Sequence, residues 1–98
     1  MSLNTMINCI NNNDLDCLKA IMEDDETFLT NKICTQLLVA CLEENQIVIA
    51  NYITKYDFDL DAKIFENYLE LNRPFTEKQI TNLNKILSKF YICCLINS

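Results

Sequence analysis

LVACLEENQIVIANYITKYDFDLDAK, residues 38–63, is the stretch that decides the fold. Its first half places apolar residues three and four positions apart, as in an amphipathic helix. Asn45 interrupts this pattern, and a second short helix is predicted to follow it. Over 56–61 aromatic or aliphatic residues alternate with acids, which predicts a short extended segment. The stretch therefore predicts two short helices, a tight turn and an extended tail.

The helical half of this stretch has an imperfect copy 32 residues upstream. The residues paired by this offset are Cys9 with Cys41, Ile10 with Leu42, Asn13 with Asn45, Leu15 with Ile47, Cys17 with Ile49, Leu18 with Ala50, and Ile21 with Ile53. One helix pair cannot bury its apolar side alone, whereas stacked pairs can, so such an offset is typical of a helical solenoid.

Helical spacing continues outside the decisive stretch. It predicts helices over about 3–11, 15–22, 35–43, 47–53 and 62–72, and a last helix that starts after Thr76 and includes Leu87. Asn13 or Asp14 is the expected N-cap of the second helix, Asp61 that of the fifth, and residues 76–79 form a capping box for the sixth. The segment 28–33 is expected to be irregular or extended. Residues 90–96 either prolong the last helix or cross the end of the stack.

The chain of 98 residues is long enough for one domain. We expect a single all-α domain over 1–98, built as a short solenoid of about three helix pairs at 3–34, 35–61 and 62–98. The alternative is that the same six helices fold as a compact bundle, as in death-fold adaptor domains of similar length.

The middle repeat resembles the ankyrin repeat family. That family has a small pair in its first helix, a glycine turn, a Leu-x-Ile-Val second helix, and Gly-Ala-Asp-Val-Asn-Ala leading into a hairpin. The matching residues here are Cys41 and Leu42, then Asn45, then Ile47, Ile49 and Ala50, and finally the run 57–62. Residues 36–39 replace the family's Thr-Pro-Leu-His opening, and the chain has no glycine or histidine. The hydrogen bonds that tie neighbouring ankyrin repeats together are therefore expected to be missing.

The resemblance implies a non-enzymatic protein–protein interaction module that binds a protein partner through hairpin tips and a helix face. The residues proposed to contact the partner are an acidic run and the aromatic, acidic tail of the middle repeat: Asp24, Asp25, Glu26, Tyr56, Asp57, Phe58 and Asp59. Aromatic anchors contribute much of the affinity at interfaces, although Phe58 is equally suited to packing inside the domain. The bundle alternative implies an adaptor that self-associates, so a homo-oligomer stays open. A carboxylate–metal hydrolase using 23–26 and 57–61 is the third hypothesis.

Familiar catalytic and metal-binding patterns are missing from the sequence. Without histidine, Ser-His-Asp and Cys-His catalytic sites and mixed His/Cys zinc sites are excluded. Without glycine there is no phosphate-binding loop. Asp57, Asp59 and Asp61 have the spacing that begins an EF-hand loop, but Ala62 and Tyr68 stand where that loop needs Gly and Glu. We therefore predict no catalytic, cofactor or metal site.

Charge and cysteine usage bound the partners and the compartment. The net charge of −6 disfavours nucleic acid and anionic membranes as partners, and no window is apolar enough to span a membrane. No secretory signal is apparent, and most of the six cysteines lie in apolar patterns, so we expect free thiols and an intracellular, cytoplasmic location. Cys9, Cys17 and Cys41 are expected to pack inside, and Cys34 to be the exposed thiol. The Asn- and Ile-rich composition is typical of AT-rich genomes, including those of large DNA viruses.

Overall fold

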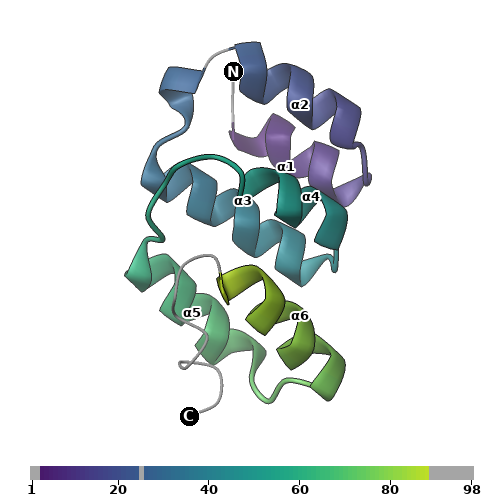
Figure 1. Ribbon diagram of the computed structural model, residues 1–98, viewed down its shortest axis with the longest axis vertical. Coiled ribbons are helices and arrows are strands. Elements are labelled where there is room, and N and C mark those ends of the chain that lie inside the picture. The colour runs from purple at the N-terminus through teal and green to yellow at the C-terminus, as the bar shows by residue number, and fades with distance from the viewer. Residues whose placement is uncertain (1–2, 25, 89–98) are drawn as a thin grey trace.

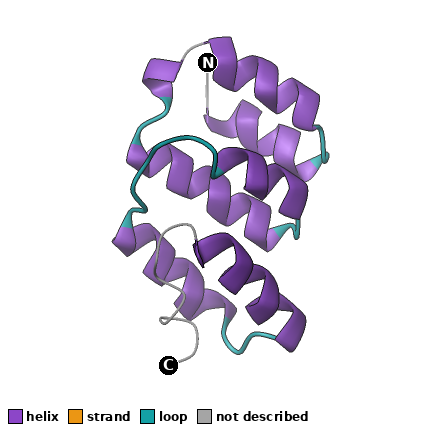
Figure 2. Cartoon of the chain, viewed as in Figure 1, coloured by secondary structure: helices purple, strands orange, loops and turns teal. Residues whose placement is uncertain are grey.

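Six α-helices account for most of the residues that the structure describes, 3–24 and 26–88 (Figure 1). In this computed structural model they are α1 (Leu3–Asn11), α2 (Leu15–Asp24), α3 (Asn31–Glu43), α4 (Ile47–Ile53), α5 (Ala62–Asn72) and α6 (Glu77–Leu87). A single 3₁₀ turn, η1 (Glu26–Phe28), follows α2. Figure 2 shows no strand in the described part of the chain. The prediction of an all-α chain is confirmed.

The turns of the first two helix pairs have the same backbone structure. Asn13 has φ 55° and Asn45 has φ 56°, in the left-handed region that most residues avoid. After each asparagine the next amide donates back across the turn, Asp14 N to Cys9 O at 2.8 Å and Gln46 N to Cys41 O at 2.8 Å. Asparagine tolerates this conformation better than other non-glycine residues, which explains its use in a chain without glycine. The offset of 32 positions therefore relates two turns of like structure.

The helices pack in the order of the chain. α1 contacts α2 and α3, α3 contacts α4 and α5, and α4 contacts α6. Figure 1 shows the three pairs following one another along the longest axis, and the molecule measures 39 × 24 × 20 Å. The first two pairs share one apolar cluster, whose buried members on the helices are Met6, Cys9, Ile10, Leu18, Met22, Cys34, Leu37, Leu38, Ala40, Cys41, Ile49, Ala50, Ile53 and Ile86.

The third pair departs from the first two. Its helices meet through large side chains in a second cluster of Phe65, Tyr68, Leu69, Leu83 and Leu87. The stretch 73–76, which the first two pairs lack, contains a cis peptide bond before Pro74 and places Phe75 against this cluster. The ring centroids of Tyr68 and Phe75 are 6.1 Å apart. Aromatic rings thus fill the space that aliphatic and thiol side chains fill in the first two pairs.

Side-chain caps set the helix boundaries. Asp14 Oδ1 accepts from Cys17 N at 3.1 Å and Asp61 Oδ1 accepts from Ile64 N at 3.2 Å, as expected for the second and fifth helices. Thr76 and Gln79 form the expected capping box, with Gln79 N donating to Thr76 Oγ1 at 3.2 Å and Thr76 N donating to Gln79 Oε1 at 2.8 Å. These three predictions are confirmed.

The start of the third helix was predicted wrongly. The sequence pattern placed it near Thr35 and left 28–33 irregular or extended, whereas α3 begins at Asn31. Thr30 is its N-cap, because the hydroxyl of Thr30 accepts from Ile33 N at 3.2 Å. The 3₁₀ turn η1 also occupies residues that were expected to be extended. The earlier start turns Cys34 and Thr35 into the interior.

Two further expectations concern membrane-spanning helices and the end of the chain. No helix in 3–24 or 26–88 is long and apolar enough to cross a membrane. Residues 90–96, whose path was left open, lie outside the described residues.

The turn geometry predicts how substitutions at Asn45 affect folding. Asn45→Gly keeps the left-handed conformation accessible, whereas Asn45→Val places a β-branched side chain in it. We expect the valine variant to be less stable than the glycine variant by about 1–2 kcal/mol in urea unfolding. The same pair of variants at Asn13 is the matched comparison. Equal stabilities for the Gly and Val variants would show that these turns do not need the left-handed residue.

Candidate protein-binding surfaces

Hydrogen bonds join the segment 57–61 to the start of α3. Asp59 N donates to Asn31 Oδ1 at 3.0 Å, and Asp61 N donates to Thr35 Oγ1 at 2.9 Å. Thr35 is fully buried and its hydroxyl also donates to Asn31 O at 2.7 Å. Side-chain hydrogen bonds therefore join this segment to α3, and their acceptors, Asn31 and Thr35, lie upstream of residues 36–39, where the family resemblance placed such residues.

The segment does not form the hairpin that the resemblance implies. Residues 57–61 contain no strand, and their amides bond to side chains of α3 instead of to a second strand. Phe58 is 8% exposed and belongs to the main apolar cluster, so its ring packs inside the domain. Asp57 and Asp59 on either side of it are exposed. The alternation read from the sequence thus places the aromatic side chain inward and the acids outward.

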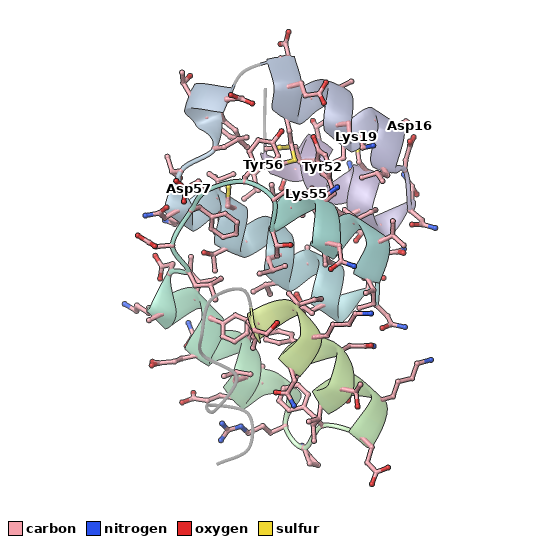
Figure 3. The ribbon with its side chains drawn as sticks, viewed as in Figure 1. Asp16, Lys19, Tyr52, Lys55, Tyr56 and Asp57 are labelled. Atoms are coloured by element: carbon pink, nitrogen blue, oxygen red, sulfur yellow. The ribbon has the colours of Figure 1, made fainter. Side chains whose placement is uncertain are left out.

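Two tyrosines of the second pair form a contact on the face shared by α2 and α4. The rings of Tyr52 and Tyr56 lie edge to face with centroids 5.7 Å apart, and their hydroxyl oxygens are 3.1 Å apart. Lys19 Nζ of α2 lies 5.3 Å from the Tyr52 ring centroid, a cation–π distance. Figure 3 shows Lys19, Tyr52 and Tyr56 in sequence across this face, with the residues Asp16, Lys55 and Asp57 around them.

The acidic run after α2 lies close to this tyrosine pair. Burial raises the pKa of Tyr56, and the hydrogen bond and charge of Tyr52 and then the charges of Glu26 and Glu23 raise it further. Glu26 of the run 24–26 is therefore within electrostatic reach of Tyr56 of the segment 56–59. We call Lys19, Glu23, Glu26, Tyr52 and Tyr56 the tyrosine–acid surface.

The remaining predicted contact residues are placed as follows. Asp24 and Glu26 are exposed and Tyr56 is half-buried. Asp25 lies outside the described residues. Lys19 and Tyr52 were not among the predicted contact residues, because they lie far apart in the chain and no local pattern indicates their contact.

A groove of about 390 Å³ lies on a different face, where the first helices of the three pairs meet. Its lining residues are Leu3, Ile7 and Asn11 of α1, Gln36, Val39, Ala40 and Glu43 of α3 with Glu44 next to them, and Ile64 of α5. Leu3, Ile7, Val39 and Ile64 are only partly buried, so they leave apolar surface open to solvent. The sequence predicted a binding helix face but none of these residues individually.

One end of the groove carries negative charge. Glu43 and Glu44 are exposed at the C-terminal end of α3, where the helix dipole is also negative. Two carboxylates at the negative end of a helix dipole attract a cation more than an isolated acid does. The groove therefore combines an apolar floor with an electronegative end.

The exposed thiol is Cys17 and not Cys34. Cys34 is 1% exposed, and burial raises its pKa to about 11, so the expectation of a reactive Cys34 is wrong. The cause is the earlier start of α3, which puts Cys34 on the buried side of the helix instead of at its edge. Cys9 and Cys41 are buried as expected, whereas Cys17, which was expected to pack inside, is exposed. No group of three or more His, Cys, Asp or Glu side chains in the described ranges is arranged to hold a metal ion.

Comparison of this chain with protein-family models, with curated proteins and with solved structures gave no match.

The tyrosine contact predicts a pH dependence of stability. Tyr56→Phe removes a hydrogen bond and should cost about 1 kcal/mol at neutral pH. The raised pKa of Tyr56 means that the folded state holds this proton more tightly than the unfolded state, whose value is near 10.0. Wild-type stability is therefore complete below pH 10 and falls as pH rises above it, and Tyr56→Phe lacks this contribution. In urea titrations, the difference in free energy of unfolding between wild type and Tyr56→Phe should therefore decrease above pH 10.

Tyr52→Phe is the matched control, since it removes the same hydrogen bond but keeps the phenol of Tyr56. Its stability should still fall with pH, because burial continues to raise the pKa of Tyr56, but by less than in the wild type, because the hydrogen bond and charge of Tyr52 are gone. A gap between wild type and Tyr56→Phe that stays constant across this pH range would contradict the role assigned to Tyr56.

Proposed function

We propose that this chain is a non-enzymatic protein-interaction module in which three helix pairs stack as a short ankyrin-like solenoid. Three observations support the stacking. The turns at Asn13 and Asn45 have like geometry, α1, α3 and α5 are successive neighbours, and the longest dimension of 39 Å is nearly twice the shortest of 20 Å. Units that repeat in this way bury their apolar sides against each other and leave one continuous face for binding.

The groove across α1, α3 and α5 carries the binding proposal. Each of the three pairs contributes its first helix, and each contributes at least one apolar side chain to the floor: Ile7, Val39 and Ile64 among them. A groove of this kind accepts the apolar face of a partner helix or an extended segment. Burial of these open apolar side chains would provide the favourable free energy of association.

The charges favour a partner segment that carries positive charge. Glu43 and Glu44 lie at one end of the groove, and the chain as a whole carries a net charge of −6. The partner segment accordingly presents Lys or Arg beside apolar anchors. Asp57, Asp59 and the acids of the tyrosine–acid surface add potential of the same sign, which speeds the encounter with a cationic partner. The predicted contact residues 24–26 and 56–59 would contribute to this electrostatic attraction. The proposed location is the cytoplasm, where thiols stay reduced.

Selection from a displayed random peptide library tests the proposal. We expect the peptides that bind the full chain to be enriched in Lys or Arg next to Leu, Ile or Phe. Reversal of both groove acids, Glu43→Lys with Glu44→Lys, should weaken the binding of a selected peptide by about tenfold at low salt. Binding of the wild type should also weaken as salt is raised.

A double reversal on α5 outside the groove, Glu66→Lys with Glu70→Lys, is the matched control. It changes the net charge by the same amount at two exposed residues that do not line the groove. Equal losses for the two double variants would contradict the groove as the binding site. Enrichment of acidic peptides would overturn the partner chemistry. Sedimentation that shows concentration-dependent self-association, with no peptide selected, would instead favour the six-helix adaptor.

A further inference from the structure

Two thiols face each other across the first helix pair. Cys9 Sγ of α1 lies 3.1 Å from Cys17 Sγ of α2, with the thiol of Cys9 donating toward the sulfur of Cys17. Both are free thiols. Cys9 is 6% exposed, whereas Cys17 is open to solvent. One member of the pair is therefore accessible to a small reagent and the other lies directly behind it.

The helix register of the pair holds the two sulfur atoms together. In the second pair the same positions are occupied by Cys41 and Ile49, both fully buried. Both residues belong to the main apolar cluster, so these two positions lie on the packed sides of α3 and α4 as well. In the first pair Asp14 accepts from the amide of Cys17 and fixes the start of α2. Each thiol is therefore held in place by a helix, Cys9 by α1 and Cys17 by α2.

We propose that Cys9 and Cys17 are a redox modification site that hydrogen peroxide converts into a disulfide between α1 and α2. A disulfide bond is about 2.05 Å long, so the sulfur atoms must approach by only about 1 Å. Exposed thiols meet peroxide first, and a neighbouring thiol then captures the oxidised sulfur. Disulfides of cytoplasmic proteins are typically transient and redox-sensing, which agrees with this use.

The reaction balances with one molecule of peroxide. The Cys17 thiol loses its proton, and its sulfur attacks one peroxide oxygen. The O–O bond breaks, and the leaving hydroxide takes that proton to form water, which leaves Cys17 as a sulfenic acid. The sulfur of Cys9 then attacks the sulfur of Cys17, the S–O bond breaks, and the departing hydroxide takes the proton of Cys9 to form a second water. Burial, with the hydrogen bond and the charge of Cys17 behind it, raises the pKa of Cys9 to about 11, so Cys9 stays a thiol until this step.

A tryptic peptide map after peroxide treatment of the folded chain tests the proposal. Lys19 is the first basic residue, so peptide 1–19 contains Cys9 and Cys17 and no other cysteine. We expect this peptide to lose about 2 Da and to resist alkylation by N-ethylmaleimide until it is reduced. Peptide 33–55, which contains the buried Cys34 and Cys41, is the internal control and should lose its thiols at least about tenfold more slowly.

Stability and a matched variant complete the test. Oxidation should raise the Tm by roughly 5–15 °C, because the cross-link restricts the unfolded chain, and a reducing agent should reverse the change. Cys17→Ser removes the accessible thiol. After peroxide treatment, peptide 1–19 of this variant should show no loss of about 2 Da, and the Tm of the variant should stay the same. Two alkylatable thiols in peptide 1–19 of the treated wild type would overturn the proposal. A sulfonic acid at Cys17, or a dimer linked through Cys17, would overturn it equally.

Discussion

The left-handed turn between the helices of a pair is the constraint on which the rest of the structure depends. Asn13 and Asn45 have φ values of 55° and 56°, and the amide after each donates back to the preceding helix. The turn reverses the chain within a few residues, so the apolar sides of both helices in a pair face the same neighbour. In a chain without glycine, asparagine is the residue that adopts the left-handed conformation of this turn at low cost. It occurs again 32 positions later, at the matching turn.

Helix α3 then joins the pairs into one body. It contacts α1, α4 and α5, and its first residues fasten the segment that leads to α5. The buried hydroxyl of Thr35 donates to Asn31 O and accepts from Asp61 N, so both of its hydrogen-bonding roles are filled. Because Asp61 is also the N-cap of α5, this one hydroxyl links the interior of the second pair to the start of the third. Removing it would leave the half-buried amide of Asp61 without this hydrogen bond.

Local patterns predicted the fold better than they predicted the surfaces. Patterns of only a few neighbouring residues specify the helix spacing, the turn asparagines and the caps at Asp14, Asp61 and Thr76. These predictions are confirmed. The start of α3 was missed because 30–34 lacks a strong apolar period, and the cap at Thr30 outweighed it. The contact of Lys19 with Tyr52 and the lining of the groove join residues far apart in the chain. Such contacts follow only from the stacking of complete helix pairs.

Helix α1 lies between the two chemically distinct features of the molecule. One side of it supplies Leu3 and Ile7 to the groove, and Cys9 on the same helix contacts Cys17. The equivalent helix of the second pair has Cys41, and the position that matches Cys17 is occupied by the inert side chain of Ile49, both buried. The two pairs thus share a shape but differ in reactivity at one matched position. A covalent bond at Cys9 would act on the same helix that supplies Leu3 and Ile7 to the groove.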